Sequence, residues 1–247
     1  NAVGTIQSPA GRRNPGCFDY ALYLKSIGIT STMTAENLSV ETGAKTMQGR
    51  LFLVKENFID RLSARTNSDT AAVIKAIMFG DKGELDEGTL EVFQRNGTAH
   101  ILAVSGLHIG IIYGFLLKIW TLLGSLTGGM IGGSRRWCFF GFIAAFFSCY
   151  MVFAGFSPSV VRAVLMVLLH VFAQITNRRY DLNNAALLVV TIVLAHNPFM
   201  IFNAGFQMSF LAVLTMTLVM PFIKNVYSGI FLASLAVQIG LGPFVIY

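Results

Sequence analysis

The chain changes character at about residue 98, where charged positions almost disappear and long apolar stretches begin. Residues 98–247 contain few charged side chains: Lys118, Arg135, Arg136, Arg162, Arg178, Arg179, Asp181 and Lys224. The apolar stretches cover about 99–123, 137–155, 158–177, 184–201, 204–222 and 229–247. Each contains about 18–25 residues, enough for a helix rising 1.5 Å per residue to cross about 30 Å of hydrocarbon. The pattern predicts an all-α polytopic membrane domain of about six transmembrane helices over residues 98–247.

The first part of the chain has the pattern of a water-exposed protein. Residues 1–49 mix short β-favouring runs with the turn formers Gly, Pro and Ser. Within them, residues 18–27 have the apolar spacing of a helix. We therefore expect the end of a small β domain with one inserted helix, whose first strands precede residue 1.

Residues 50–97 are expected to form amphipathic and connecting helices. The apolar side chains of residues 50–66 fall on one face: Leu51, Val54, Phe58 and Leu62. This helix either packs on the β domain or lies in the membrane interface. Two more helices are expected at 68–79, with Ser68 or Asp69 as the N-cap, and at 86–95. Residues 1–97 thus predict a partial extracytoplasmic α+β segment.

The charge distribution orients the membrane domain. The chain has a formal net charge of +6, from 18 Lys and Arg and 12 Asp and Glu, and residues 98–247 carry the whole excess. If the first span runs inward, then Lys118, the pair Arg135 and Arg136, the pair Arg178 and Arg179, and Lys224 all lie inside. Residues 1–97 then face outward from the cytoplasmic membrane. Attraction of a polyanion is a second reading of the same excess, and the two are compatible.

The sequence offers no sign of a cofactor, a metal site or an enzyme. Cys17, Cys138 and Cys149 form no CxxC motif, and the four histidines form no HxH cluster. The chain starts at Asn1 without a Met and ends inside an apolar run. We therefore expect it to be a piece of a longer protein.

The first predicted span holds one group of candidate residues. Gly106, Gly110 and Gly114 recur every four residues, a spacing that lets another helix approach closely. His108 is expected in mid-span beside Ser105, and an ionisable residue there is a functional candidate. A neutral His108 hydrogen-bonded to a neighbouring helix is the structural alternative.

The later spans add further polar candidates. Arg162 lies about one turn into the third span, where it either snorkels to the outer interface or faces an aqueous cavity. Asp181 is expected as an N-cap beside Arg178 and Arg179. The polar side chains that we take as candidates for lining a path are Ser105, Gly106, His108, Arg162, Asp181, Asn183, Gln207, Ser209 and Gln238.

Several motifs occur in a fixed order: SGLHIG, GFSPSVVRA, RRYDLNN, NPF and GFQMSF. This set resembles the competence domain of the ComEC family, the inner-membrane channel for DNA uptake in bacterial transformation. The run NPGCFDYALYLKSI, at 14–27, looks like the close of the family's outward OB-like domain. Met208 stands where the family more often has Leu, a volume-conserving change. The further helices and metallo-β-lactamase-like nuclease domain of many members are not in this chain.

The resemblance implies that the chain conducts single-stranded DNA into the cytoplasm. Its expected partners are single-stranded DNA, the lipid bilayer and other competence proteins, with a second copy of the chain as a candidate. Two rival functions remain: a small-solute secondary transporter and a non-conducting envelope scaffold for a nuclease domain. The transporter would need an intramembrane carboxylate, and the spans offer none away from Asp181.

Overall fold

The computed structural model describes residues 2–9, 11, 19–38, 47–98, 102, 104–126, 133–219, 222 and 226–246. The chain divides into two compact units, which are described separately. One unit comprises Gly43–Tyr180, and the other combines Asn1–Thr42 with Asp181–Tyr247. The fold is mostly helical, in agreement with the sequence-based prediction.

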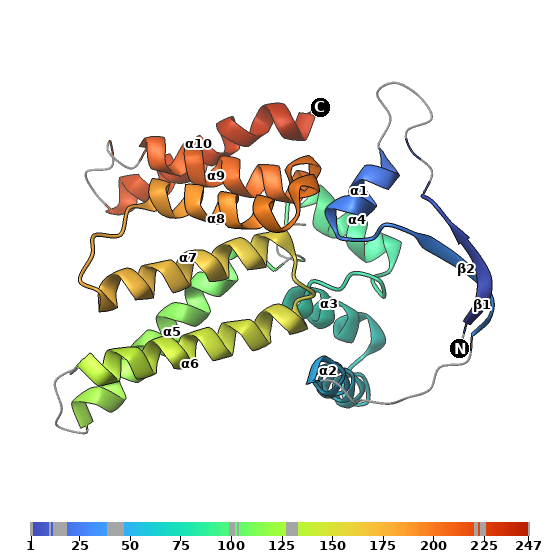
Figure 1. Ribbon diagram of the computed structural model, residues 1–247, viewed down its shortest axis with the longest axis horizontal. Helices are drawn as coiled ribbons and strands as arrows, with labels where there is room; N and C mark the ends of the chain where they lie inside the picture. Colours follow the sequence, from blue (N-terminus) through green and yellow to red (C-terminus); the bar gives the residue numbers. More distant parts are fainter. Residues whose placement is uncertain are drawn as a thin grey trace. The chain divides into compact units, whose positions relative to one another are not determined.

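The unit Gly43–Tyr180 contains six of the described helices. They are α2 (Met47–Ser63), α3 (Ser68–Phe79), α4 (Glu87–Arg95), α5 (Gly106–Leu126), α6 (Gly133–Phe153) and α7 (Pro158–Ile175). Helix α7 contacts both α5 and α6, and the three helices run side by side (Figure 1). Their shared core contains Val104, Ile109, Phe139, Ile143, Phe147, Val160, Val164 and Val171. Apolar side chains at helical spacing thus produce a three-helix layer.

The amphipathic helix α2 packs against α3 and α6. The ring centroids of Phe58 on α2 and Phe79 on α3 are 6.1 Å apart, in an edge-to-face arrangement. Tyr150 of α6 donates a hydrogen bond of 3.3 Å to the carbonyl of Met78. The ring centroids of Phe79 and of Phe153 on α6 are 6.3 Å apart, so an aromatic contact and a hydrogen bond hold the connecting helices to the candidate span α6.

Local signals set the helix ends in this unit. The Asn67 side chain accepts a bond from the Ser68 N–H, so the N-cap of α3 is Asn67 rather than Ser68 or Asp69. Helix α3 ends at Phe79, and the φ of +73° at its C-cap Gly80 suits a residue without a Cβ. Pro158 occupies the first turn of α7 behind Ser157, which stands at the N-cap position without a side-chain capping bond.

The second unit joins a two-stranded sheet to the later apolar helices. Strands β1 (Ala2–Gln7) and β2 (Thr32–Leu38) pair antiparallel, with a register shift between Val3 and Gly4, and α1 (Tyr20–Ser26) lies between them in sequence. The apolar elements are α8 (Leu182–His196), the 3-10 helix η2 (Pro198–Phe202), α9 (Ala204–Val219) and α10 (Val226–Ile246). Helices α8, α9 and α10 lie side by side in that order (Figure 1).

Fewer helices than six meet the length and composition of a membrane span in the part of the chain that the structure describes. Three do so: Gly106–Ser125, Arg135–Phe153 and Pro158–Ile175. Helices α8 and α9 are apolar but contain 15 and 16 residues. At 1.5 Å per residue they reach only about 22–24 Å, less than the hydrocarbon thickness of about 30 Å. The predicted fourth stretch is shortened because Asn197 and Pro198 end α8.

Of the expected N-terminal domain, the structure describes two strands and one helix. Within the described residues the sheet has two strands, and an OB-like domain is not established. The helix expected at 18–27 is observed as Tyr20–Ser26. Residues 39–40, which form one of the β-favouring runs expected within 1–49, and Cys17 lie outside the described residues.

Candidate functional site

The start of α5 contains a local hydrogen-bonded unit formed by Ser105 and His108. The Ser105 N–H donates to His108 Nδ1 at 3.1 Å, and Ser105 Oγ lies 2.9 Å from the same nitrogen. The Ser105 carbonyl accepts the first helical bond from the Ile109 N–H, at 3.4 Å. Ser105 is thus the N-cap and His108 the third helical residue, the two positions of a capping box. An imidazole takes the place that Glu or Gln usually fills.

This geometry assigns the tautomer of His108. A backbone N–H can only donate, so Nδ1 must accept from Ser105. The neutral imidazole therefore carries its proton on Nε2. The structure also corrects the expected depth of the residue, because α5 begins at Gly106 and His108 lies in its first turn rather than in mid-span.

Gly106 brings the start of α5 against Arg162 of α7. A Cβ built on Gly106 would lie 3.3 Å from Arg162 Nη2 and 3.7 Å from the Cβ of Ala163. Because Gly106 has no side chain, the Arg162 guanidinium can occupy the space beside it. Arg162 Nη1 also lies 3.9 Å from the sulfur of Met166, one turn further along α7.

Gly110 and Gly114 differ from Gly106. Both are exposed, and no described atom lies within 4 Å of a Cβ built on either. Of the expected glycine face, therefore, only Gly106 meets another helix within the described residues. A close helix contact at the other two positions stays a prediction.

Ser159 ties the start of α7 to the segment before α5. Its Oγ donates to the Val104 carbonyl at 2.8 Å, and it lies 3.5 Å from Ser157 Oγ. We call Ser105, Gly106, His108, Ser159 and Arg162 the Arg162 cluster. It brings together four of the residues that the sequence singled out and adds Ser159.

The Arg162 cluster has a positive electrostatic environment. The N-terminal ends of α5 and α7 both lie at it, and a helix N-terminus carries about half a positive charge. Residues 98–180 contain no Asp or Glu, so the three helices have a net positive charge. A cation and two helix N-termini together suit the attraction of an anion.

The remaining candidates lie in the other unit and are spread along it. Asp181 is the N-cap of α8, where its Oδ1 accepts from the Asn184 N–H at 2.9 Å, and Asn183 is exposed beside it. Gln207 donates to the Ile201 carbonyl at 2.8 Å near the start of α9, close to half-buried Ser209. Gln238 is exposed on α10.

These residues do not form one local site within their unit. The 15 residues of α8 separate Asp181 at its start from the beginning of α9, a length of about 22 Å. The path-lining role of all five is untested by the geometry and stays a prediction.

Sequence reasoning missed a pair of asparagines that flank η2. The Asn197 side-chain amide donates to the Ser26 carbonyl at 2.9 Å, and the buried Asn203 amide donates to Ser26 Oγ at 3.2 Å. Their oxygens accept from the N–H groups of Phe199 and Phe206, which caps η2 and α9. The signal that was available is an Asn immediately before each helix.

The geometry so far defines a membrane protein with three candidate spans and a cationic cluster between two of them. The competence protein family matches residues 77–247, about two thirds of the sequence. The chain belongs to this family, as the ordered motifs had indicated.

Proteins with related sequences occur in several bacteria. ComE operon protein 3 of Bacillus subtilis is 26% identical over 99% of this chain, and recombination protein 2 of Haemophilus influenzae is 27% identical over 83%. An uncharacterized protein of Aquifex aeolicus is 29% identical over 70%. The matches cover 31%, 25% and 38% of those proteins, so the chain spans about a quarter to two fifths of its relatives. No solved structure matches.

Proposed function

We propose that this chain forms part of the path by which single-stranded DNA crosses the cytoplasmic membrane during natural transformation. Membership of the competence protein family supports a role in DNA uptake. The names of two relatives, ComE operon protein 3 and recombination protein 2, support the same role. That the chain itself conducts the strand is the more specific part of the proposal.

One observation carries the conduction step, namely the Arg162 guanidinium in the space beside Gly106 at the joined starts of α5 and α7. A translocating strand presents a phosphate at every nucleotide, and a path for it needs positive potential. Arg162 supplies a fixed charge there, and the helix N-termini add to it. Ser105 and Ser159 provide hydroxyl groups at the same end.

In this proposal residues 1–97 face outward and the basic loops face the cytoplasm. The chain acts with other competence proteins and as a homodimer. Its residues bind and guide DNA without catalysing a reaction, and any nuclease step belongs to another domain.

The test is uptake of labelled DNA by cells whose chromosomal copy carries Arg162→Ala. We expect DNA to reach the outer surface while its entry into the cytoplasm falls at least about tenfold, because a charge-assisted contact to phosphate is lost. The variant protein must remain abundant in the membrane fraction.

Arg95→Ala is the matched control. Arg95 is exposed on α4 and pairs with Glu91 at 2.6 Å. Normal entry in the Arg162→Ala strain, with normal protein levels, would remove Arg162 from the path. Normal entry after deletion of the gene would reject the DNA assignment and favour the transporter.

A further inference from the structure

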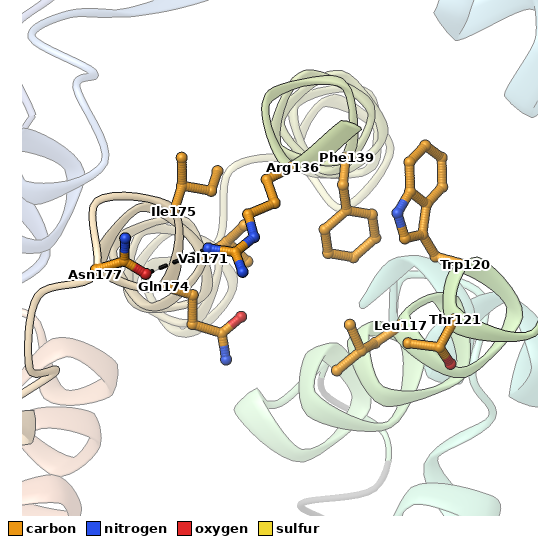
Figure 2. Close-up of a pocket in the computed structure, with 9 residues that line it drawn as sticks. All are labelled: Leu117, Trp120, Thr121, Arg136, Phe139, Val171, Gln174, Ile175 and Asn177. Carbon is orange, nitrogen blue, oxygen red and sulfur yellow. Dashed lines mark hydrogen bonds between the residues drawn. The ribbon is translucent and has the colours of Figure 1, made fainter. Parts of the chain in front are cut away.

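A second polar feature lies at the other end of α5, α6 and α7. It is a pocket of about 330 Å³, formed where α5 and α7 end and α6 begins (Figure 2). Its walls come from Leu117, Trp120, Thr121, Arg136, Phe139, Val171, Gln174, Ile175 and Asn177. The Arg162 cluster, at the starts of α5 and α7, contributes no residue to it.

One side of the pocket is cationic and polar. Arg136 Nη1 donates to Asn177 Oδ1 at 3.2 Å, a bond that uses one of the five guanidinium N–H groups (Figure 2). The Gln174 amide extends into the same space (Figure 2), and its nitrogen lies 3.0 Å from His170 Nε2. These groups place a cation and an amide along one side of the pocket, where an anion can bind.

The other side is apolar and aromatic. Leu117 and Phe139 supply hydrocarbon surface, and the centroids of the Trp120 and Phe139 rings are 5.2 Å apart. Arg135 lies over the Trp120 ring, with its guanidinium carbon 5.7 Å from the centroid. The Trp120 indole N–H is buried and has no hydrogen-bond partner among the described residues. The pocket therefore has an apolar and aromatic wall beside its cationic side.

The depth of the pocket limits what reaches it. It lies at the ends of the three helices that are long and apolar enough to cross a membrane. At that depth a headgroup meets its acyl chains, and basic pockets between membrane helices bind anionic headgroups. A volume of about 330 Å³ is at the small end of ligand pockets. It accommodates a headgroup and the start of an acyl chain rather than a whole lipid.

We propose that this pocket binds the phosphate of an anionic phospholipid. Arg136 donates to the phosphate, with Gln174 as a further donor, and the first acyl carbons lie against Leu117 and Phe139. Residues 98–180 contain no acidic side chain, so charge favours an anionic lipid over a zwitterionic one. The site is separate from the proposed DNA path and does not depend on it.

The two tryptophans of the chain make the site measurable. The sequence contains only Trp120 and Trp137, and Trp137 does not line the pocket. In a Trp137→Phe background of the full chain in detergent micelles, the tryptophan emission comes from Trp120 alone. Phosphatidylglycerol and phosphatidylcholine with the same acyl chains are then titrated in. We expect a saturable emission change with phosphatidylglycerol and none with phosphatidylcholine.

Two variants with the same change in net charge test the contact. Arg136→Gln should weaken the phosphatidylglycerol response about tenfold, since a charge-assisted bond becomes a neutral one. Arg179→Gln is the control, because Arg179 is exposed in the segment after α7 and lines no part of the pocket. It should leave the response within about twofold, a difference that screened surface charges produce.

A pocket-filling variant covers the case in which Arg136→Gln does not fold. Thr121→Phe leaves the charge unchanged, places a ring at an exposed position of the pocket wall, and should abolish the response. Equal responses to the two lipids, or equal weakening by Arg136→Gln and Arg179→Gln, would overturn the proposal.

Two competitors identify the source of the phosphate. Failure of inorganic phosphate and of a short single-stranded oligonucleotide to displace phosphatidylglycerol would support a lipid site. Displacement by inorganic phosphate would reassign the pocket to a free anion. Displacement by the oligonucleotide would make the pocket part of the DNA path. Either displacement would reject the proposed lipid site.

Discussion

At the scale of single residues, the Arg162 cluster shows how structural and functional roles share one short segment. His108 begins α5 by accepting the Ser105 N–H, and Gly106 leaves space for Arg162. Both residues therefore stabilise the start of α5, which faces Arg162. A loss of uptake after substitution has to be separated from a loss of helix stability.

His108 permits that separation because Gln is a natural capping-box residue at the same position. We expect His108→Ala to lower the free energy of unfolding by about 0.5–2 kcal/mol, the usual cost of a lost cap, and His108→Gln to recover most of it. Thermal unfolding in detergent, followed by circular dichroism, measures both. If His108→Gln unfolds like the natural protein yet fails in DNA uptake, the imidazole has a role beyond capping.

Gly106 and Gly110 form a matched pair on α5. In Gly106→Val the side chain would begin 3.3 Å from Arg162 Nη2, closer than an ordinary contact, so the guanidinium must move. We expect lower DNA entry in that strain at a normal protein level. Gly110→Val meets no described atom within 4 Å and should leave entry unchanged. The reverse order of effects would show that Gly110, not Gly106, faces an essential partner.

At the scale of elements, hydrogen bonds and ion pairs of single side chains join neighbouring helices and loops. The Asn203 amide joins η2 and α9 to α1, and Lys75 joins α3 to the loop before α4. Both residues are buried polar groups with bonded partners, which is the condition for such groups to be tolerated inside a protein.

Asn203→Ala should destabilise the unit that contains α1 and α9. It removes an acceptor from the Phe206 N–H and a donor to Ser26 Oγ, and stranded buried groups cost about 1–3 kcal/mol. The change in unfolding temperature measures it. Asn183→Ala, at an exposed position of α8, is the control and should stay within about 0.5 kcal/mol.

The Lys75 ion pair predicts a dependence on pH. The hydrogen bond to Glu84, at 2.5 Å, is the main cause that raises the pKa of Lys75 above its ordinary value of 10.5, and Asp81 at 3.6 Å adds to it. Because the folded pKa is the higher one, the stabilisation is fully present below pH 10.5 and disappears as the pH rises through the folded value.

Glu84→Gln tests this dependence. Glu84 is largely exposed, so the variant should lose less than about 1 kcal/mol at pH 7. The free energies of unfolding of the natural protein and of Glu84→Gln are measured with denaturant at pH 7 and at a pH above the pKa of Lys75 in the folded protein. Their difference should vanish at the alkaline pH, and a difference that persists there would assign the effect to packing.

At the scale of the whole molecule, the sequence predicts an orientation in the membrane, and three helices are candidate spans among the described residues. The three candidate spans α5, α6 and α7 cross the membrane an odd number of times, so the segment before α5 and the segment after α7 are expected on opposite sides. The basic residues Arg178 and Arg179 favour the cytoplasm for the latter.

Cysteine labelling tests this topology. In a background whose three cysteines are replaced by Ser, Asn96→Cys before α5 should react with a membrane-impermeant maleimide in intact cells. Asn177→Cys after α7 should react only after permeabilisation. Both positions are exposed in the structure, so a difference reports the side of the membrane. Labelling of both in intact cells would reject the orientation.

The sequence by itself determined the helical character of the chain and the positions of α5, α6 and α7 to within a few residues at most ends. It also determined the N-cap role of Asp181 and, through the ordered motifs, the family. These features depend on periodicity, composition and neighbouring residues, which are local properties of the chain.

Only the tertiary structure decided which polar residues meet. Asn203 and Ser26 are 177 positions apart, and the contact of Gly106 with Arg162 depends on how α5 and α7 are rotated against each other. The same holds for the pocket between Trp120 and Arg136, whose walls come from three helices. Helix rotation and crossing are set by the packing of many side chains at once, so no local pattern specifies them.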